Sequence, residues 1–295
     1  MKNRKAENIP IQNTIRNLNY KVSDKPYYEI EKLKLLRDKI LNSGISYQAN
    51  KSDRTLTSCK LESEKFMKSH FKLHNIFYLR ELKDGKISGN DALDPYKLPI
   101  EKTDKGFSYV ETFWLPFRNV AQQIFFSEIG INENFTEFTP STISHEITHT
   151  QQEPQNGIVD FYTNQEVLPL FIETLHYNEI SSPYKEDSKA IAKRLVLLAN
   201  EISKLESLSI TNKNLNDCKG TTSYERILLS NKYLESALKA LNLFDIYNNS
   251  SSNIKQEILN YIQNIFNANK SLEDFLDYYD VTFESSLDSL QKKFK

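Results

Sequence analysis

Two histidines with an acid beside the first form the pattern in this chain that is best suited to chemistry. The segment is His145-Glu146-Ile147-Thr148-His149. On a helix of 3.6 residues per turn, both histidines project from one face, one turn apart, and can reach the same metal ion. Glu146 can then take a proton from a water on that ion, as in HExxH zinc sites. The pattern therefore predicts Zn²⁺ bound by His145 and His149, with Glu146 as the catalytic general base.

A catalytic zinc needs a third protein ligand and an open fourth position. Two acids downstream are candidates. Asp160 follows His149 by eleven residues, whereas Glu166 stands near the start of a second predicted helix that the Pro154–Gly157 turn would bring back toward the histidines. We favour Glu166 as the third ligand and keep Asp160 as the alternative.

A second acid, Glu173, stands seven residues after Glu166, which is two helical turns along the same face. It could accept a hydrogen bond from the second ring nitrogen of a ligating histidine and so fix its tautomer. The residues between the two acids are almost all apolar, which indicates a helix buried around most of its circumference. Acids on such a helix need cationic partners.

Taken together, residues 145–149 and 166–173 resemble the active site of the gluzincin metallopeptidases, most closely the thimet oligopeptidase and oligoendopeptidase F group. The resemblance implies a zincin-like catalytic core in which His145, His149 and Glu166 bind zinc. It also implies that Glu146 is the general base and that Glu173 supports a ligand from behind.

The chain departs from that group in its later residues. Thr148 stands where the group usually has glycine, and no histidine follows His176, so the group's downstream segment of His, Gly and Tyr residues has no counterpart. The sequence therefore does not decide which residue would stabilise a developing oxyanion. The candidates are Tyr224, Tyr233, Tyr278, Tyr279 and His176. A second histidine pair, His70 and His74, has Lys68 and Lys72 nearby and no acid beside it, and we expect a packing or solvated role for it.

Composition excludes several classes of function. The 295 residues carry 38 Lys and Arg against 39 Asp and Glu, a net charge of −1, so there is no basic surplus for nucleic acid. Seven glycines occur and none builds a nucleotide-binding loop. The two cysteines, Cys59 and Cys218, are too few and too far apart for a cysteine zinc site or a disulfide framework.

The chain contains no run of about 18 apolar residues, so we expect no membrane span. Its first residues are polar where a secretory signal would be apolar, which favours the cytoplasm by default and leaves non-classical secretion open. The sequence does not indicate an oligomeric state.

Periodicity predicts a mainly α fold of the α+β type with a small antiparallel sheet. We expect a loose arm over 1–26, an α+β subdomain over 27–138 and a helical subdomain over 139–295 that carries both site helices. Strand patterns occupy Ile76–Leu82, before a turn at Asp84-Gly85, and the aromatic segment 107–131 is expected to pack in the core near the site. Thr139 is expected to cap the first site helix, and helices are predicted over 140–153, 164–180, 184–207, 222–244, 253–267 and 271–290.

The sequence therefore predicts a zinc-dependent metallopeptidase that hydrolyses a peptide or protein substrate by Glu-assisted attack of a zinc-bound water. Two alternatives stay open. The chain could be a helical interaction or scaffold protein with a non-catalytic HExxH segment, or a zinc-dependent hydrolase of a non-peptide amide.

Overall fold

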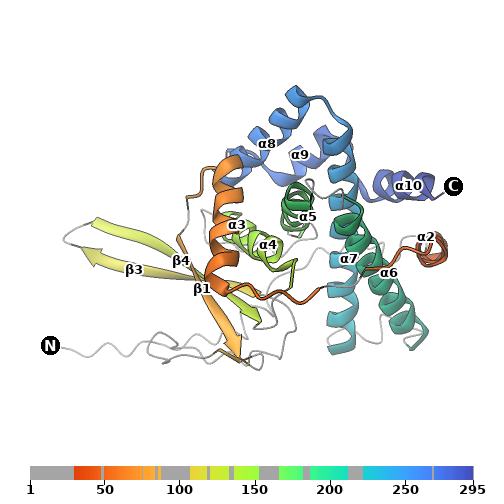
Figure 1. Ribbon diagram of the computed structural model, residues 1–295, viewed down its shortest axis with the longest axis horizontal. Helices are drawn as coiled ribbons and strands as arrows, with labels where there is room; N and C mark the ends of the chain where they lie inside the picture. Colours follow the sequence, from red (N-terminus) through yellow and green to blue (C-terminus); the bar gives the residue numbers. More distant parts are fainter. Residues whose placement is uncertain are drawn as a thin grey trace.

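The computed structural model describes residues 30–47, 50–74, 76–83, 86–87, 107–117, 120–132, 136–152, 166–181, 187–211, 222–267 and 269–294. The expected N-terminal arm over 1–26, the segment 90–106 and Asp160 lie outside these residues. The described chain is mainly helical, as predicted, with a sheet on one side of the helical body (Figure 1).

The bounds of the elements follow the chain order. The helices are α2 Ile30–Asn42, α3 Leu56–His70, α4 Thr139–Gln151, α5 Val167–Ser181, α6 Asp187–Thr211, α7 Thr222–Asn249, α8 Ser252–Phe266, α9 Leu272–Tyr278 and α10 Phe283–Lys293. The strands are β1 Ile76–Lys83, β2 Lys86–Ile87, β3 Phe107–Phe117 and β4 Val120–Asn132.

The sheet has the order β2-β1-β4-β3 and is mixed. Strand β1 is antiparallel to β2, and β3 is antiparallel to β4, but β1 and β4 run parallel. This differs from the antiparallel sheet expected from the sequence. The alternation of side chains along a strand does not encode the direction of its neighbour, and β1 pairs with a strand that begins more than thirty residues further along the chain.

Helix α4 lies at the junction between the sheet and the helical body. It contacts β3 and β4 on one side, and α3 and α5 on others (Figure 1). A hydrogen bond from the Ser63 hydroxyl on α3 to the carbonyl of Pro140, 2.6 Å long, ties the start of α4 to α3. The helix that carries both predicted histidine ligands is thus held by several neighbouring elements.

Helix α5 is buried around most of its circumference, as its apolar sequence predicts. Phe171 and Ile172 are fully buried with the residues before them, and the helix contacts α4, α6 and α7. Burying each such side chain contributes about 1.5–3 kcal/mol. The same core extends from α2 to α10 and includes the thiol of Cys59 on α3, whose burial raises its pKa.

Two local expectations are corrected. Phe138, not Thr139, precedes the first turn of α4, and it has helical backbone angles and makes no side-chain cap. The side chain of Thr139 serves the turn before the helix instead. Its hydroxyl accepts a hydrogen bond from the backbone N–H of Thr136.

The helix predicted over 271–290 is two helices, α9 and α10. Asp280, between them, has φ of +52°, a left-handed conformation that ends a helix and that Asp tolerates better than most residues. Thr282 then caps the start of α10 through a capping box shared with Ser285.

Candidate metal centre

The two histidines of the HExxH segment lie on the face of α4 opposite its core residues. Ile143 and Ile147 on the same helix are fully buried in the hydrophobic core. His145 and His149 project toward α5, with their ring centroids 4.9 Å apart. The apolar residues of α4 therefore set the rotation of the helix that presents both imidazoles to the neighbouring helix.

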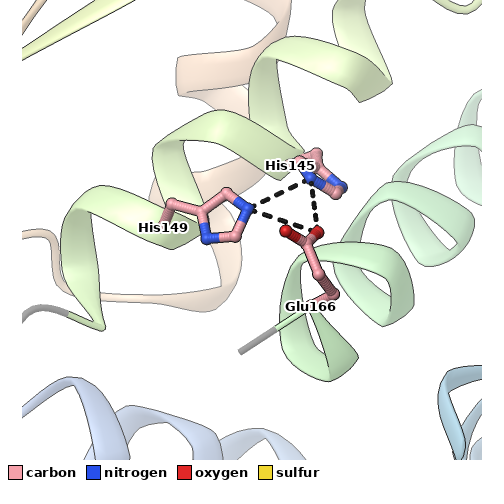
Figure 2. A group of neighbouring side chains, drawn as sticks. All are labelled: His145, His149 and Glu166. Carbon is pink, nitrogen blue, oxygen red and sulfur yellow. Dashed lines mark hydrogen bonds and ion pairs between the residues drawn. The ribbon is translucent and has the colours of Figure 1, made fainter. Parts of the chain in front are cut away.

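Glu166 completes a triangle with these imidazoles (Figure 2). It lies one residue before α5, and its carbonyl accepts a helical hydrogen bond from the N–H of Leu170. Its Oε2 is 3.3 Å from His145 Nε2 and 3.4 Å from His149 Nε2, and the two Nε2 atoms are 3.2 Å apart. The predicted third ligand thus faces the pair, and no other group of this kind occurs among the described residues.

The triangle has the size that a zinc ion requires. Ligand atoms 2.0–2.2 Å from one ion at tetrahedral angles lie about 3.3–3.6 Å from each other. Two of the observed separations, 3.3 and 3.4 Å, lie at the short end of this range, and the third, 3.2 Å between the two Nε2 atoms, lies just below it. Two imidazole nitrogens and one carboxylate oxygen are also a known donor set for catalytic zinc. Both the geometry and the chemistry of the donors therefore fit the metal.

Glu173 lies behind His145, on the side away from the triangle. Its Oε2 is 3.2 Å from His145 Nδ1. This contact favours a hydrogen on Nδ1, which directs the lone pair of Nε2 toward Glu166 and His149. The predicted supporting role of Glu173 is thus compatible with the position of its carboxylate.

Two cations from α6 pair with the Glu173 carboxylate. Lys193 Nζ is 2.7 Å from Oε1, and the Arg194 guanidinium pairs with Oε2. The sequence indicated that acids on this apolar helix need cationic partners, and these residues are the partners of Glu173. It did not identify them, because adjacent Lys and Arg residues twenty positions away are an ordinary feature of a helix surface.

The charges of the site shift its pKa values in opposite directions. Burial alone would lower the pKa of His145, but the close carboxylates of Glu166 and Glu173 and the charge of Glu146 raise it to about 10. Burial would raise the pKa of Glu166, yet its contacts with both histidines hold it far below the usual value. Arg194, Lys193 and His145 likewise overcome burial and keep the pKa of Glu173 well below its ordinary range.

Glu146 is buried beside the triangle on α4. On an ideal helix it points about 100° away from His145 and about 60° away from His149. Its negative charge contributes to the raised pKa of His145. Glu146 is thus positioned on the flank of the histidine face.

The remaining candidate residues have different surroundings. His70 pairs with Glu179 at 3.0 Å, and His74 on the surface contacts Asn267. His176 is buried and its Nδ1 is 2.8 Å from the hydroxyl of Ser144. The sequence predicted a packing or solvated role for His70 and His74 and did not foresee the pairing of His70 with an acid. Among the described residues, none of these three histidines belongs to the triangle.

Among the tyrosines considered as oxyanion donors, Tyr233 on α7 is linked to the site. It hydrogen-bonds Arg194, and burial together with the carboxylates of Glu173 and Glu166 raises its pKa although Arg194 opposes this. Tyr278 instead donates to Glu257 at 3.1 Å, with Tyr279 beside it. The side chain of Tyr224 lies outside the described residues.

Comparison with known proteins found no matching family model, no matching curated protein and no matching solved structure. Among the described residues, no helix is both long enough and apolar enough to cross a membrane.

Proposed function

We propose that this chain is a zinc-dependent metallopeptidase of the gluzincin type. The observation that carries the proposal is the triangle of His145 Nε2, His149 Nε2 and Glu166 Oε2, whose sides measure 3.2–3.4 Å. The carboxylate of Glu173 behind His145 supports the same assignment, because ligating histidines are commonly oriented by a carboxylate at the other ring nitrogen.

His145, His149 and Glu166 would hold the ion, and Glu146 would perform the proton transfers. A zinc ion bound there would supply Lewis acidity, lowering the pKa of a water to about 7 and polarising a substrate carbonyl. Glu146 takes the proton from the attacking water and delivers it to the leaving amine. General acid–base catalysis of this kind contributes about 10²- to 10⁴-fold to the rate.

Zinc content tests the metal site. We expect one zinc per chain in the purified wild type and a large loss in Glu166→Ala, because two imidazoles alone make a weak site. Asp160→Ala is the matched control, since Asp160 was the alternative ligand, and it should retain the metal. Loss of zinc in Asp160→Ala with retention in Glu166→Ala would contradict the assignment.

Hydrolysis of a broad peptide library tests the reaction. We expect cleavage by the zinc-loaded wild type and a drop of about 10²- to 10⁴-fold in Glu146→Gln, with the zinc content unchanged. Zinc binding without peptide cleavage, but with cleavage of small amides that is lost in Glu146→Gln, would favour a non-peptide amidase. Absence of zinc from the wild type would favour an interaction protein.

A further inference from the structure

We propose that Arg194 is a positioning residue for the metal site, acting on His145 through Glu173. The inference rests on the metal site of the proposed function, but not on the identity of the substrate. Arg194 lies on α6, is 4% exposed and does not belong to the triangle. Its guanidinium pairs with Oε2 of Glu173, the same oxygen that lies 3.2 Å from His145 Nδ1.

Arg194 is itself held in place from two further directions. Its Nε donates to the hydroxyl of Thr174 on α5 at 3.2 Å, and it hydrogen-bonds Tyr233 on α7. The planar guanidinium presents its donors in a fixed arrangement, so these contacts define its orientation. Oε2 of Glu173 therefore contacts a guanidinium that is anchored to both α5 and α7.

The two oxygens of Glu173 are divided between different partners. Lys193 takes Oε1 at 2.7 Å, whereas Arg194 and His145 share Oε2. Arg194 consequently controls the oxygen that faces the imidazole, and Lys193 controls the other one. Removing Arg194 frees Oε2 to move away from His145, while removing Lys193 leaves the Oε2 contacts in place.

The expected consequence is a change in metal affinity. Loss of the group that orients a ligating histidine typically weakens metal binding 10- to 100-fold. We expect Arg194→Met to weaken Zn²⁺ binding by about this factor. Arg194→Lys should recover part of the loss, because it keeps the charge but cannot reproduce the fork of donors. Lys193→Met should have a smaller effect than Arg194→Met.

A double-mutant cycle distinguishes action through Glu173 from a general structural effect. The Zn²⁺ dissociation constant is measured by competition with a chromophoric chelator for the wild type, Arg194→Met, Glu173→Gln and the double variant. If Arg194 acts through Glu173, adding Arg194→Met to Glu173→Gln should change the constant by less than about twofold. The double variant also removes both buried charges together, which avoids leaving one of them unpaired.

One further measurement and one control variant separate positioning from folding. The visible absorption spectrum of the Co²⁺-loaded protein should change in Arg194→Met, because it depends on the arrangement of the ligands. Arg37→Met is the matched control. Like Arg194, Arg37 pairs with a glutamate of a neighbouring helix, but its partner, Glu206, lies away from the site. This variant should alter the free energy of unfolding and leave both the Zn²⁺ constant and the Co²⁺ spectrum unchanged.

These experiments distinguish failure of the proposed role of Arg194 from failure of the proposed function. A wild type that binds no zinc overturns both proposals. Normal zinc binding with unchanged affinity in Arg194→Met, or fully additive losses in the cycle, overturns only the role of Arg194. Weakened binding with non-additivity supports that role even if no peptide is cleaved. Should Arg194→Met fail to fold, the comparison of Arg194→Lys with the wild type, and of the double variant with Glu173→Gln, decides the question.

Discussion

His145 and His176 are both buried where α4 meets α5, yet their surroundings drive their proton affinity in opposite directions. Burial disfavours the charged form of each ring. At His145 the contacts with Glu166 and Glu173 outweigh burial and raise the pKa to about 10. At His176 burial dominates, with the charges of nearby cations acting in the same direction, and the pKa falls to about 3. The neighbouring carboxylates thus separate a candidate ligand from a neutral core histidine.

The neutral state of His176 predicts a specific loss of stability in acid. Below pH 6.5 the unfolded chain takes up a proton on this ring, whereas the folded chain does so only near pH 3. The free energy of unfolding should therefore fall as the pH drops through this window, by up to about 1.4 kcal/mol per pH unit from this group. Urea unfolding between pH 7 and about pH 4 should show a shallower decline in His176→Phe than in the wild type.

Two features of the surroundings define the control for this experiment. The ring of His176 stacks on Phe66 with centroids 4.1 Å apart, and phenylalanine can retain that contact. Ser144→Ala removes the hydrogen bond to Nδ1 but keeps the histidine. It should lower stability at all pH values and preserve the acid-dependent slope. Equal slopes in the wild type and His176→Phe would contradict a buried neutral imidazole.

At the scale of elements, α5 combines a buried apolar surface with the polar groups of the site. Phe171 is fully buried and its ring packs edge-on against Tyr247 of α7, with centroids 5.8 Å apart. Glu166 and Glu173 of the same region face α4. Packing of the apolar residues therefore fixes the rotation of α5, and this rotation directs both acids toward the histidines.

Truncation of Phe171 should consequently destabilise the protein strongly. We expect Phe171→Ala to lower the free energy of unfolding by about 3–5 kcal/mol, because it leaves a cavity in a close-packed core. Urea unfolding of the metal-free protein measures this change. Leu61→Ala on α3 is the control, since Leu61 is 62% exposed, and it should change stability by less than about 0.5 kcal/mol. Similar effects of both substitutions would contradict the central position of α5.

The sequence predicted the features of α4 and α5 that depend on local pattern. The spacing of His145 and His149 predicts a shared face, and the apolar run around Glu166 and Glu173 predicts burial with charged partners. The partners themselves were not predictable, because Lys193 and Arg194 reach Glu173 only through the packing of α6 on α5. The break between α9 and α10 at Asp280 was also not predicted, because no glycine or proline marks it.

At the scale of the whole molecule, the candidate site joins parts of the chain that meet only after folding. The ligands come from α4 and the start of α5, and the cations that hold Glu173 come from α6. The unfolded chain lacks this arrangement. An ion that binds the three ligands would therefore favour the folded state by mass action.

Zinc should accordingly stabilise the protein against unfolding. At a free concentration 100 times the dissociation constant, the expected gain is about 2.7 kcal/mol, seen as a rise in the thermal midpoint that a chelator reverses. Glu166→Ala should abolish most of this gain, because it removes one corner of the triangle. An equal zinc-dependent rise in Glu166→Ala would show that the ion binds elsewhere.

The thiol of Cys59 offers a built-in reporter on the support of α4. It is completely enclosed on α3, the helix that is hydrogen-bonded to the start of α4. In a Cys218→Ser background, an alkylating reagent can modify Cys59 only when α3 separates from its neighbours. We expect slow labelling whose rate follows the frequency of that separation, and rapid labelling in urea. The chain thus carries its own probe of how often the scaffold around the histidines opens.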